Sequence, residues 1–325
     1  LKANTTADNN TAIGHNALTA NTTGAENVAV GYKAMYANTT SNKNTAFGYE
    51  SLYANTTGTE NVAVGAYALD ANTTADYNVA VGYNAMTQST TAQRCVAVGR
   101  EAGESLTTGS YNTLLGYTAG HEITTGYRNV AIGEESMYFV TTGSLNVCVG
   151  NQTLHLNKTG NENTALGFRA CYGGTTGTAN VGVGCSALKS VSTGNNNVAV
   201  GKNALNANTT GSSNVAIGDE AAENTVQGNG CVAIGYKALH TTTDAGNTVA
   251  IGYEAMENAT NDSSGNVMVG YRCGHNMNDG DDNTAIGYAA LYSITQAHRN
   301  VAVGKNTLYT NTDSAHDNVA IGYEA

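Results

Sequence analysis

Nineteen glycines recur along the chain at an almost constant spacing, and this period constrains the fold more than any other feature. From Gly14 to Gly252 every interval is seventeen positions, and of the four intervals up to Gly322 the first and the last are one position longer. A strict period of this length indicates one structural unit stacked many times. Common helical solenoids need about 33 residues or more per repeat, so the period excludes them. We therefore expect a solenoid built from short strands and turns.

Each repeat has the same pattern of side chains around its glycine, which we number as position 0. Position −4 is usually Asn, position −3 is only Val or Thr, position −2 is mostly Ala, and position −1 is always apolar. Position +4 is Leu or Met in most repeats. In one typical repeat these positions are held by Asn27, Val28, Ala29, Val30, Gly31 and Met35.

Branched apolar residues at positions −3 and −1 predict a strand over positions −4 to −1, since such residues favour strands and alternate residues share a face. We expect Val28 and Val30 to face the core, and a second strand over positions +2 to +5 to bring Met35 to the same core. The predicted fold is an all-β parallel β-solenoid, or β-roll, of nineteen 17-residue coils. Each coil would contain two short strands, paired in register with those of the next coil.

Alanine rows predict how the coils associate. Positions −2 and +3 hold Ala in most repeats, as at Ala29 and Ala34, and we expect the position −2 row to point away from the core. A stripe of small apolar residues permits the close approach of another surface. We therefore expect a parallel homotrimeric fibre, intertwined or side by side. The alternative is a single two-layered roll whose alanine rows flatten its outer face.

Asparagine and threonine mark the remaining positions. Position −4 is Asn in sixteen of nineteen repeats, which predicts either a ladder of stacked amides or a turn-forming role. The recurrent Asn-Thr-Thr segment predicts the return corner of the coil. It also matches the N-glycosylation sequon, and we expect these asparagines to be unmodified: Asn4, Asn21, Asn38, Asn55, Asn72 and Asn208.

Composition narrows the classes of partner. The net charge of −11 argues against nucleic-acid binding, which needs a basic face. We find no membrane-spanning run, so we expect no membrane insertion.

Residues 1–325 read as one continuous repeat array without caps, and we expect a segment of a longer fibre. The cysteines share no spacing pattern, and we expect free thiols at Cys95, Cys148, Cys171, Cys185, Cys231 and Cys273.

The repeated runs NTAIGHNAL, NVAVGYKAM, NTAFGYESL and NVAVGYNAM, separated by Asn-Thr-Thr-Gly, resemble two related families over the whole chain. One is the head repeat of trimeric autotransporter adhesins, which implies a left-handed parallel β-roll trimer. The other is the repetitive shaft of bacteriophage tail-fibre proteins. The usual adhesin repeat is shorter than the repeat of this chain, which favours the phage fibre. The resemblance implies a role in attachment to a host cell.

Tyrosines are the candidate lateral binding residues. Rows at positions +1 and +5 could stack on sugar rings of a cell-surface glycan; alternatively, the rings seal the edge of the core with their hydroxyls in water. The candidate residues are Tyr32, Tyr49, Tyr83, Tyr36 and Tyr53.

Catalytic, cofactor-binding and metal-binding residues are not expected. Glu101 and Glu135 share position +2 two coils apart, near the carboxylate separation of inverting glycosidases, but no pocket is predicted around them. A local notch remains an alternative, since Gly103 and Gly120 replace Leu at position +4 in adjacent repeats. His121, His155, His240 and His275 share position +5 in coils that are not adjacent, so we expect no metal cluster. The acidic segment 279–283 lacks a complete calcium loop and is interpreted as a solvated turn.

These observations favour a non-enzymatic structural protein: the shaft of a phage tail fibre that presents a receptor-binding tip and is part of the virion. Two alternatives remain open. One is a bacterial surface adhesin whose lateral rows bind a host glycan or protein. The other is a self-assembling extracellular filament subunit. In each case the main partner is another copy of the chain, and a cell-surface receptor is the second candidate partner.

Overall fold

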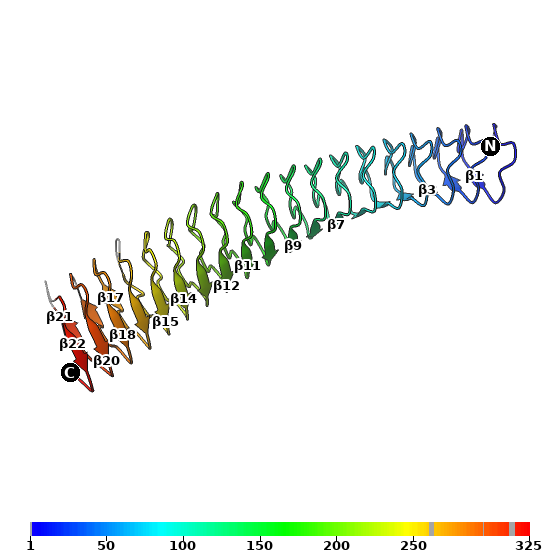
Figure 1. Cartoon of the computed structure of the whole chain (residues 1–325). Coiled ribbons are helices and arrows are strands. Elements are labelled where there is room, and N and C mark those ends of the chain that lie inside the picture. Colours follow the sequence, from blue (N-terminus) through cyan, green and yellow to red (C-terminus); the bar gives the residue numbers. More distant parts are fainter. Residues whose placement is uncertain (1, 260–262, 295, 312–315) are drawn as a thin grey trace. The chain divides into compact units, whose positions relative to one another are not determined.

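The computed structural model describes residues 2–259, 263–294, 296–311 and 316–325, and it confirms an all-β parallel β-solenoid whose coils have the predicted length. The described residues contain no helix. The chain divides into two compact units, Leu1–Glu162 and Asn163–Ala325. In each unit the strands lie side by side along one edge of the coils, and the turns project along the other (Figure 1).

Each coil contributes one three-residue strand to a parallel sheet. In the first unit these strands are β1 Thr11–Ile13, β2 Val28–Val30, β3 Thr45–Phe47, β4 Val62–Val64, β5 Val79–Val81, β6 Val96–Val98, β7 Thr113–Leu115, β8 Val130–Ile132 and β9 Val147–Val149. In the second unit they are β10 Thr164–Leu166, β11 Val181–Val183, β12 Val198–Val200, β13 Val215–Ile217, β14 Val232–Ile234, β15 Val249–Ile251, β16 Val267–Val269, β18 Thr284–Ile286, β20 Val301–Val303 and β22 Val319–Ile321.

Strand pairing within each unit follows the repeat period, as predicted. Ala46 of β3 pairs with Ala63 of β4, and Phe47 pairs with Val64. The insertions that lengthen two intervals by one position do not shift this register, since Ala302 of β20 pairs with Ala320 of β22. Identical positions therefore lie over one another along each unit.

Glycine is required at position 0 both by the backbone conformation there and by the close approach of the next coil. Gly48 has φ of 148°, in a region that L-residues rarely adopt. A Cβ atom at Gly48 would also overlap the backbone carbonyl group of Gly65 in the next coil. The same close approach recurs at Gly31 against Gly48, so the period reflects a backbone contact that no side chain can enter.

The prediction of a second strand over positions +2 to +5 is wrong. Lys33 and Met35, at positions +2 and +4, both have φ of 52°, and equivalent residues are left-handed in most other coils. Alternation between left-handed and right-handed backbone cannot form an extended strand. Among the described residues, a second short parallel sheet occurs in the second unit, at positions +6 and +7, and consists of β17 Asn276–Met277, β19 Ser293–Ile294 and β21 Thr310–Asn311.

The predicted orientation of the main strand is also reversed. Ala29 is fully buried, whereas Val28 is 37% exposed and Val30 is half-buried. Ala34 at position +3 is fully buried as well. The alanine rows thus line the core and leave no outer stripe of small residues, while Met35 lies in the core as expected. The interior of so short a coil is narrow, and small side chains at positions −2 and +3 leave space for the large one at position +4.

Volume compensation between positions −2 and +4 supports this explanation. Leu114 replaces alanine at position −2, and the two nearest position +4 residues are Gly103 and Gly120. A Cβ atom at either glycine would lie 2.7 Å from a methyl carbon of Leu114. Met268 at position −2 is matched in the same way by Gly274 at position +4. Core volume is therefore held nearly constant, as close packing requires.

Asparagines at position −4 form a buried ladder, as predicted. The backbone N–H of Asn44 donates to Oδ1 of Asn27 at 3.0 Å, and that of Asn61 donates to Oδ1 of Asn44 at 2.9 Å. Each side-chain N–H donates to a corner carbonyl of the following coil, as from Asn61 to Ala75 at 2.8 Å. The ladder thus satisfies buried polar groups that the three-residue strands leave unpaired.

The Asn-Thr-Thr corner carries a second ladder. The side-chain amide of Asn38 donates to Asn21 at 2.9 Å, and that of Asn55 donates to Asn38 at 3.1 Å. The first threonine hydroxyl of each corner donates to the carbonyl of the next coil, as from Thr39 to Thr56 at 3.1 Å. Five of the six sequon asparagines are fully buried, and Asn4 is exposed; the buried ones are Asn21, Asn38, Asn55, Asn72 and Asn208.

Candidate functional site

The outer face of the main sheet is the most extensive candidate surface. Positions −3 and −1 lie on this face, and neither position carries a charged residue in any repeat. Their most exposed large side chains, apart from the last coil, are Ile13 at 60%, Phe47 at 57%, Leu166 and Ile286 at 45%, Val147 at 43% and Ile217 at 40%. Large apolar patches of this kind mark contact sites on soluble proteins.

Tyrosines extend this apolar face at position +1. Tyr32 and Tyr49 stack with ring centroids 5.0 Å apart, and both rings are between one third and one half exposed. In the second unit four such rings continue without a break, at 5.2, 5.4 and 4.9 Å: Tyr236, Tyr253, Tyr271 and Tyr288. Stacking covers ring faces inside a row, so a ligand there would meet ring edges and hydroxyl groups.

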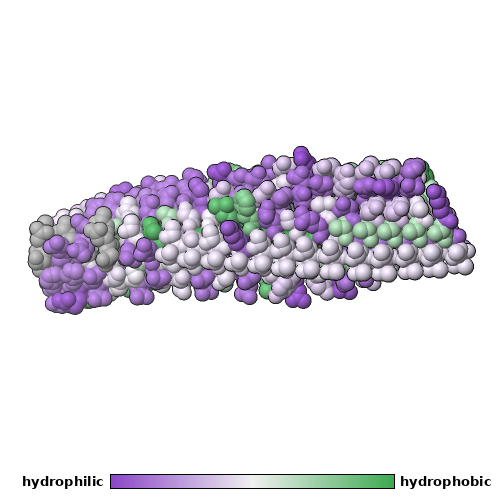
Figure 2. Space-filling view, turned by 90° about the horizontal axis from the view of Figure 1, so that it is seen from above, coloured by the Kyte–Doolittle hydropathy of each residue, from purple (hydrophilic) through white to green (hydrophobic). Residues whose placement is uncertain are grey.

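The remaining candidate tyrosines take two different arrangements. Tyr36 and Tyr53 at position +5 stack at 5.4 Å and are half-buried. Tyr83 is 47% exposed and meets Tyr67 edge to face at 6.1 Å. Figure 2 shows side chains of similar hydropathy in parallel rows on one face of the molecule, as in-register stacking produces. The structure thus places the candidate tyrosines in ordered rows, and their binding role stays a prediction.

The two carboxylates considered for catalysis line one shallow hollow of about 270 Å³ together with His155. Each carboxylate already has a partner, because Arg100 lies 2.9 Å from Glu101 and the Gln152 amide donates to Glu135 at 2.7 Å. The sequence predicted no pocket around this pair, and the hollow corrects that prediction.

Glutamates lie beside three of the position +5 histidines, and sequence analysis missed them. His121 Nε2 lies 3.0 Å from Glu104, His240 Nε2 lies 2.9 Å from Glu223, and His275 Nε2 lies 3.0 Å from Glu257. In each case the glutamate belongs to the preceding coil. The sequence signal for these pairs is Glu-x-x-Glu at positions +2 and +5, followed by His at position +5 of the next coil.

The six cysteines form no disulfide bond, as predicted, and five of them are buried. Burial raises the pKa of Cys95 to about 11 and that of Cys171 to about 12. Cys185 at position +1 is exposed. The acidic segment 279–283 forms a corner, in which Asp281 accepts a hydrogen bond from the Ser264 backbone at 2.9 Å.

Comparison with known proteins adds no family. Neither the protein-family models nor the curated proteins include a match to this chain. The described part of the chain has no helix with the length and hydropathy of a membrane span.

Proposed function

We propose that the chain is the structural shaft of a bacteriophage tail fibre, located in the virion, which holds a receptor-binding tip toward the host cell. The observation that carries this proposal is the in-register stacking of coils, joined to an uncharged apolar outer face. The resemblance of the repeats to tail-fibre shafts supports it.

Stiffness is the mechanical property that a shaft needs. Each coil donates backbone hydrogen bonds to both neighbours: Val28 to Asn44 at 2.9 Å, and Glu50 to Tyr32 at 2.9 Å. The close contact between successive position 0 glycines holds each coil against the next. Sliding or bending at one coil would break several of these contacts together. Within each unit, a stack of this kind resists bending at any single coil.

A second copy of the chain is the partner that this proposal assigns to the outer face. Rows of Val, Ile and Tyr at a constant spacing match the same rows on another copy, and neither of the two strand positions brings a charge into the contact. The proposed assembly remains a parallel homotrimer. It now depends on the outer valine and tyrosine face, because the alanine rows that first suggested it are buried.

Cell-binding and microscopy separate this proposal from its alternatives. We expect the purified chain not to adhere to candidate host cells, since a shaft leaves recognition to a tip. Adhesion that is lost in Tyr32→Ala and Tyr49→Ala variants would instead support an adhesin. Micrographs with fibres of indefinite length would support a filament subunit. Discrete particles of uniform length without adhesion are the result that the shaft requires.

A further inference from the structure

We propose that three clusters of two glutamates and one histidine each bind a divalent transition-metal ion such as Zn²⁺ and thereby link consecutive coils. Within each cluster the candidate ligand atoms lie within 4.8 Å of one another. We call these clusters the first, second and third triads: Glu101, Glu104 and His121; Glu220, Glu223 and His240; Glu254, Glu257 and His275.

The repeat itself builds this site. In all three triads the glutamates occupy positions +2 and +5 of one coil, and the histidine occupies position +5 of the next. In-register stacking places these side chains together wherever the three residue types coincide. The arrangement recurs once in the first unit and twice in the second, so it does not depend on one local irregularity.

Distances in the second and third triads suit a small tetrahedral ion. His275 Nε2 lies 3.0 Å from Glu257 and 3.5 Å from Glu254. His240 Nε2 lies 2.9 Å from Glu223 and 3.7 Å from Glu220. Zinc binds imidazole nitrogen and carboxylate oxygen at about 2.0–2.1 Å, so tetrahedral ligand atoms are about 3.3 Å apart. The histidine-to-glutamate distances of 2.9–3.7 Å lie close to this value.

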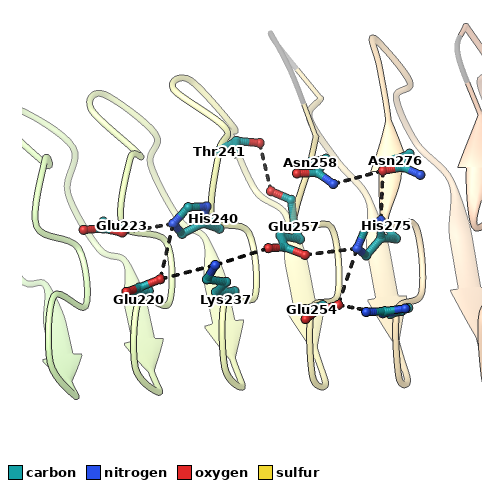
Figure 3. Close-up of polar contacts among 11 residues, drawn as sticks. Glu220, Glu223, Lys237, His240, Thr241, Glu254, Glu257, Asn258, His275 and Asn276 are labelled. Carbon is teal, nitrogen blue, oxygen red and sulfur yellow. Dashed lines mark hydrogen bonds and ion pairs between the residues drawn. The ribbon is translucent and has the colours of Figure 1, made fainter.

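The third triad has the hydrogen bond that orients a metal-binding histidine. His275 Nδ1 lies 2.9 Å from Oδ1 of Asn276, which also accepts a hydrogen bond from Asn258 at 3.0 Å (Figure 3). This arrangement assigns a proton to Nδ1 and turns Nε2 toward the two carboxylates. Second-shell bonds of this type fix the tautomer of metal-ligating histidines. Nε2 then faces the two carboxylates, where a proton on Nε2 or a metal ion in its place satisfies all three groups.

A bound metal ion would compete with nearby basic side chains for the glutamate oxygens. Arg272 lies 2.6 Å from Glu254, and Lys237 lies 3.6 Å from both Glu220 and Glu257 (Figure 3). Lys237 is shared between the second and third triads, so these two cations face four carboxylates and leave net negative charge. Arg272 holds an oxygen that faces His275. We therefore expect Arg272→Met to strengthen zinc binding by the third triad.

The donor set favours zinc over magnesium. Two carboxylate oxygens and one imidazole nitrogen are ligands that Zn²⁺ accepts in tetrahedral sites. Magnesium prefers six oxygen ligands in octahedral geometry and retains its water. Three protein ligands leave the fourth position for water. The ion would bridge two coils, and its binding would stabilise the folded chain because the unfolded chain does not assemble the site.

Metal analysis of the full chain with Zn²⁺ as the probe tests this inference. We expect about three zinc ions per chain after dialysis at micromolar free zinc, and about two for either His240→Ala or His275→Ala. The matched control is His15→Ala, because His15 stacks on Tyr32 at 5.6 Å and lies outside the triads; it should retain three. The conservative variant Glu223→Gln should also lose one ion, with far-ultraviolet circular dichroism confirming the fold.

Thermal melting and X-ray absorption complete the test. Zinc should raise the melting temperature of the wild type by about 3 °C or more and leave the triple variant His121→Ala/His240→Ala/His275→Ala unchanged. The absorption spectrum should show nitrogen and oxygen ligands without sulfur. Zinc below one ion per chain, stoichiometry insensitive to these histidines, or sulfur ligation from the cysteines would overturn the inference. None of these outcomes bears on the proposed shaft function.

Discussion

The two faces of the main strand carry opposite kinds of residue from those expected of a β-strand in water. Its inner face presents small Ala29 and buried Asn27, and its outer face presents the larger Val28 and Val30. The comparison teaches that volume, more than hydrophobicity, decides which residues enter a coil this narrow. It also leaves large apolar side chains exposed on the outer face, such as Phe47 at 57%.

Enlarging the inner face should have the largest effect. Ala80 lies fully buried at position −2, between Leu69 and Met86 at position +4. We expect Ala80→Leu to lower the free energy of unfolding by about 3 kcal/mol through overpacking, measured by urea denaturation. The triple variant Ala80→Leu/Leu69→Gly/Met86→Gly copies the arrangement around Leu114 and should recover part of the loss. A fully stable single variant would contradict the volume argument.

Removing an inner amide should have the next largest effect. Asn61 accepts the backbone N–H of Asn78 at 3.0 Å and donates to the carbonyl of Ala75 at 2.8 Å. Asn61→Ala leaves the Asn78 N–H buried without an acceptor and leaves the Ala75 carbonyl only its bond from Asn72 at 3.2 Å, so we expect a loss of about 2 kcal/mol. Asn61→Cys serves as a control, because Cys95 occupies the same position natively and its Sγ lies 3.4 Å from the Gly109 carbonyl. Equal stability of Asn61→Ala and wild type would exclude a role for the ladder.

Changing the outer face should leave the stability of a single chain almost unaltered. Phe47 is 57% exposed, so Phe47→Thr should change the free energy of unfolding of a dissociated chain by about 0.5 kcal/mol or less. The measurement belongs at a protein concentration low enough to prevent association. A loss above about 2 kcal/mol, which is the scale for truncating a large buried side chain, would place Phe47 in the core and reverse the assignment of faces.

The reactivity of the native cysteines tests which positions face the core without any substitution that would change the stability of the fold. Cys148 lies buried at position −2, Cys185 lies exposed at position +1, and burial raises the pKa of Cys273 to about 12. A thiol reagent at pH 8 should therefore modify Cys185 quickly and the five buried cysteines only after unfolding. Rapid labelling of Cys148 would show that position −2 faces solvent.

The glycine period was sufficient to predict the class of fold. The backbones of successive coils are in contact at position 0, so only glycine fits there and it recurs once in every coil. Orientation of the strand could not be predicted in the same way. Val28 and Ala29 are both apolar, so hydrophobicity does not tell which of them faces the core. The volume available inside the coil depends on Met35, which has a left-handed backbone conformation that residue propensities do not predict. The constancy of Asn at position −4 allowed either an amide ladder or a turn-forming role, and the structure shows the ladder.

The sequence contains the pattern of the Glu–Glu–His triads, but the triads were not predicted from it. Glu254 and His275 are separated by more than one full coil in the sequence, and the triads appear only when residues are compared by position in successive coils. The hollow beside Glu101 could not be predicted, because it depends on the side-chain conformations of Tyr117 and Tyr138.

Light scattering of the purified chain most directly tests whether the outer valine and tyrosine face is covered by other copies. The proposed homotrimer predicts a mass near three times the 33.3 kDa of one chain, and a shift toward 33.3 kDa when Phe47 and Val64 are both replaced by lysine. A wild-type mass of 33.3 kDa at high micromolar concentration would contradict it.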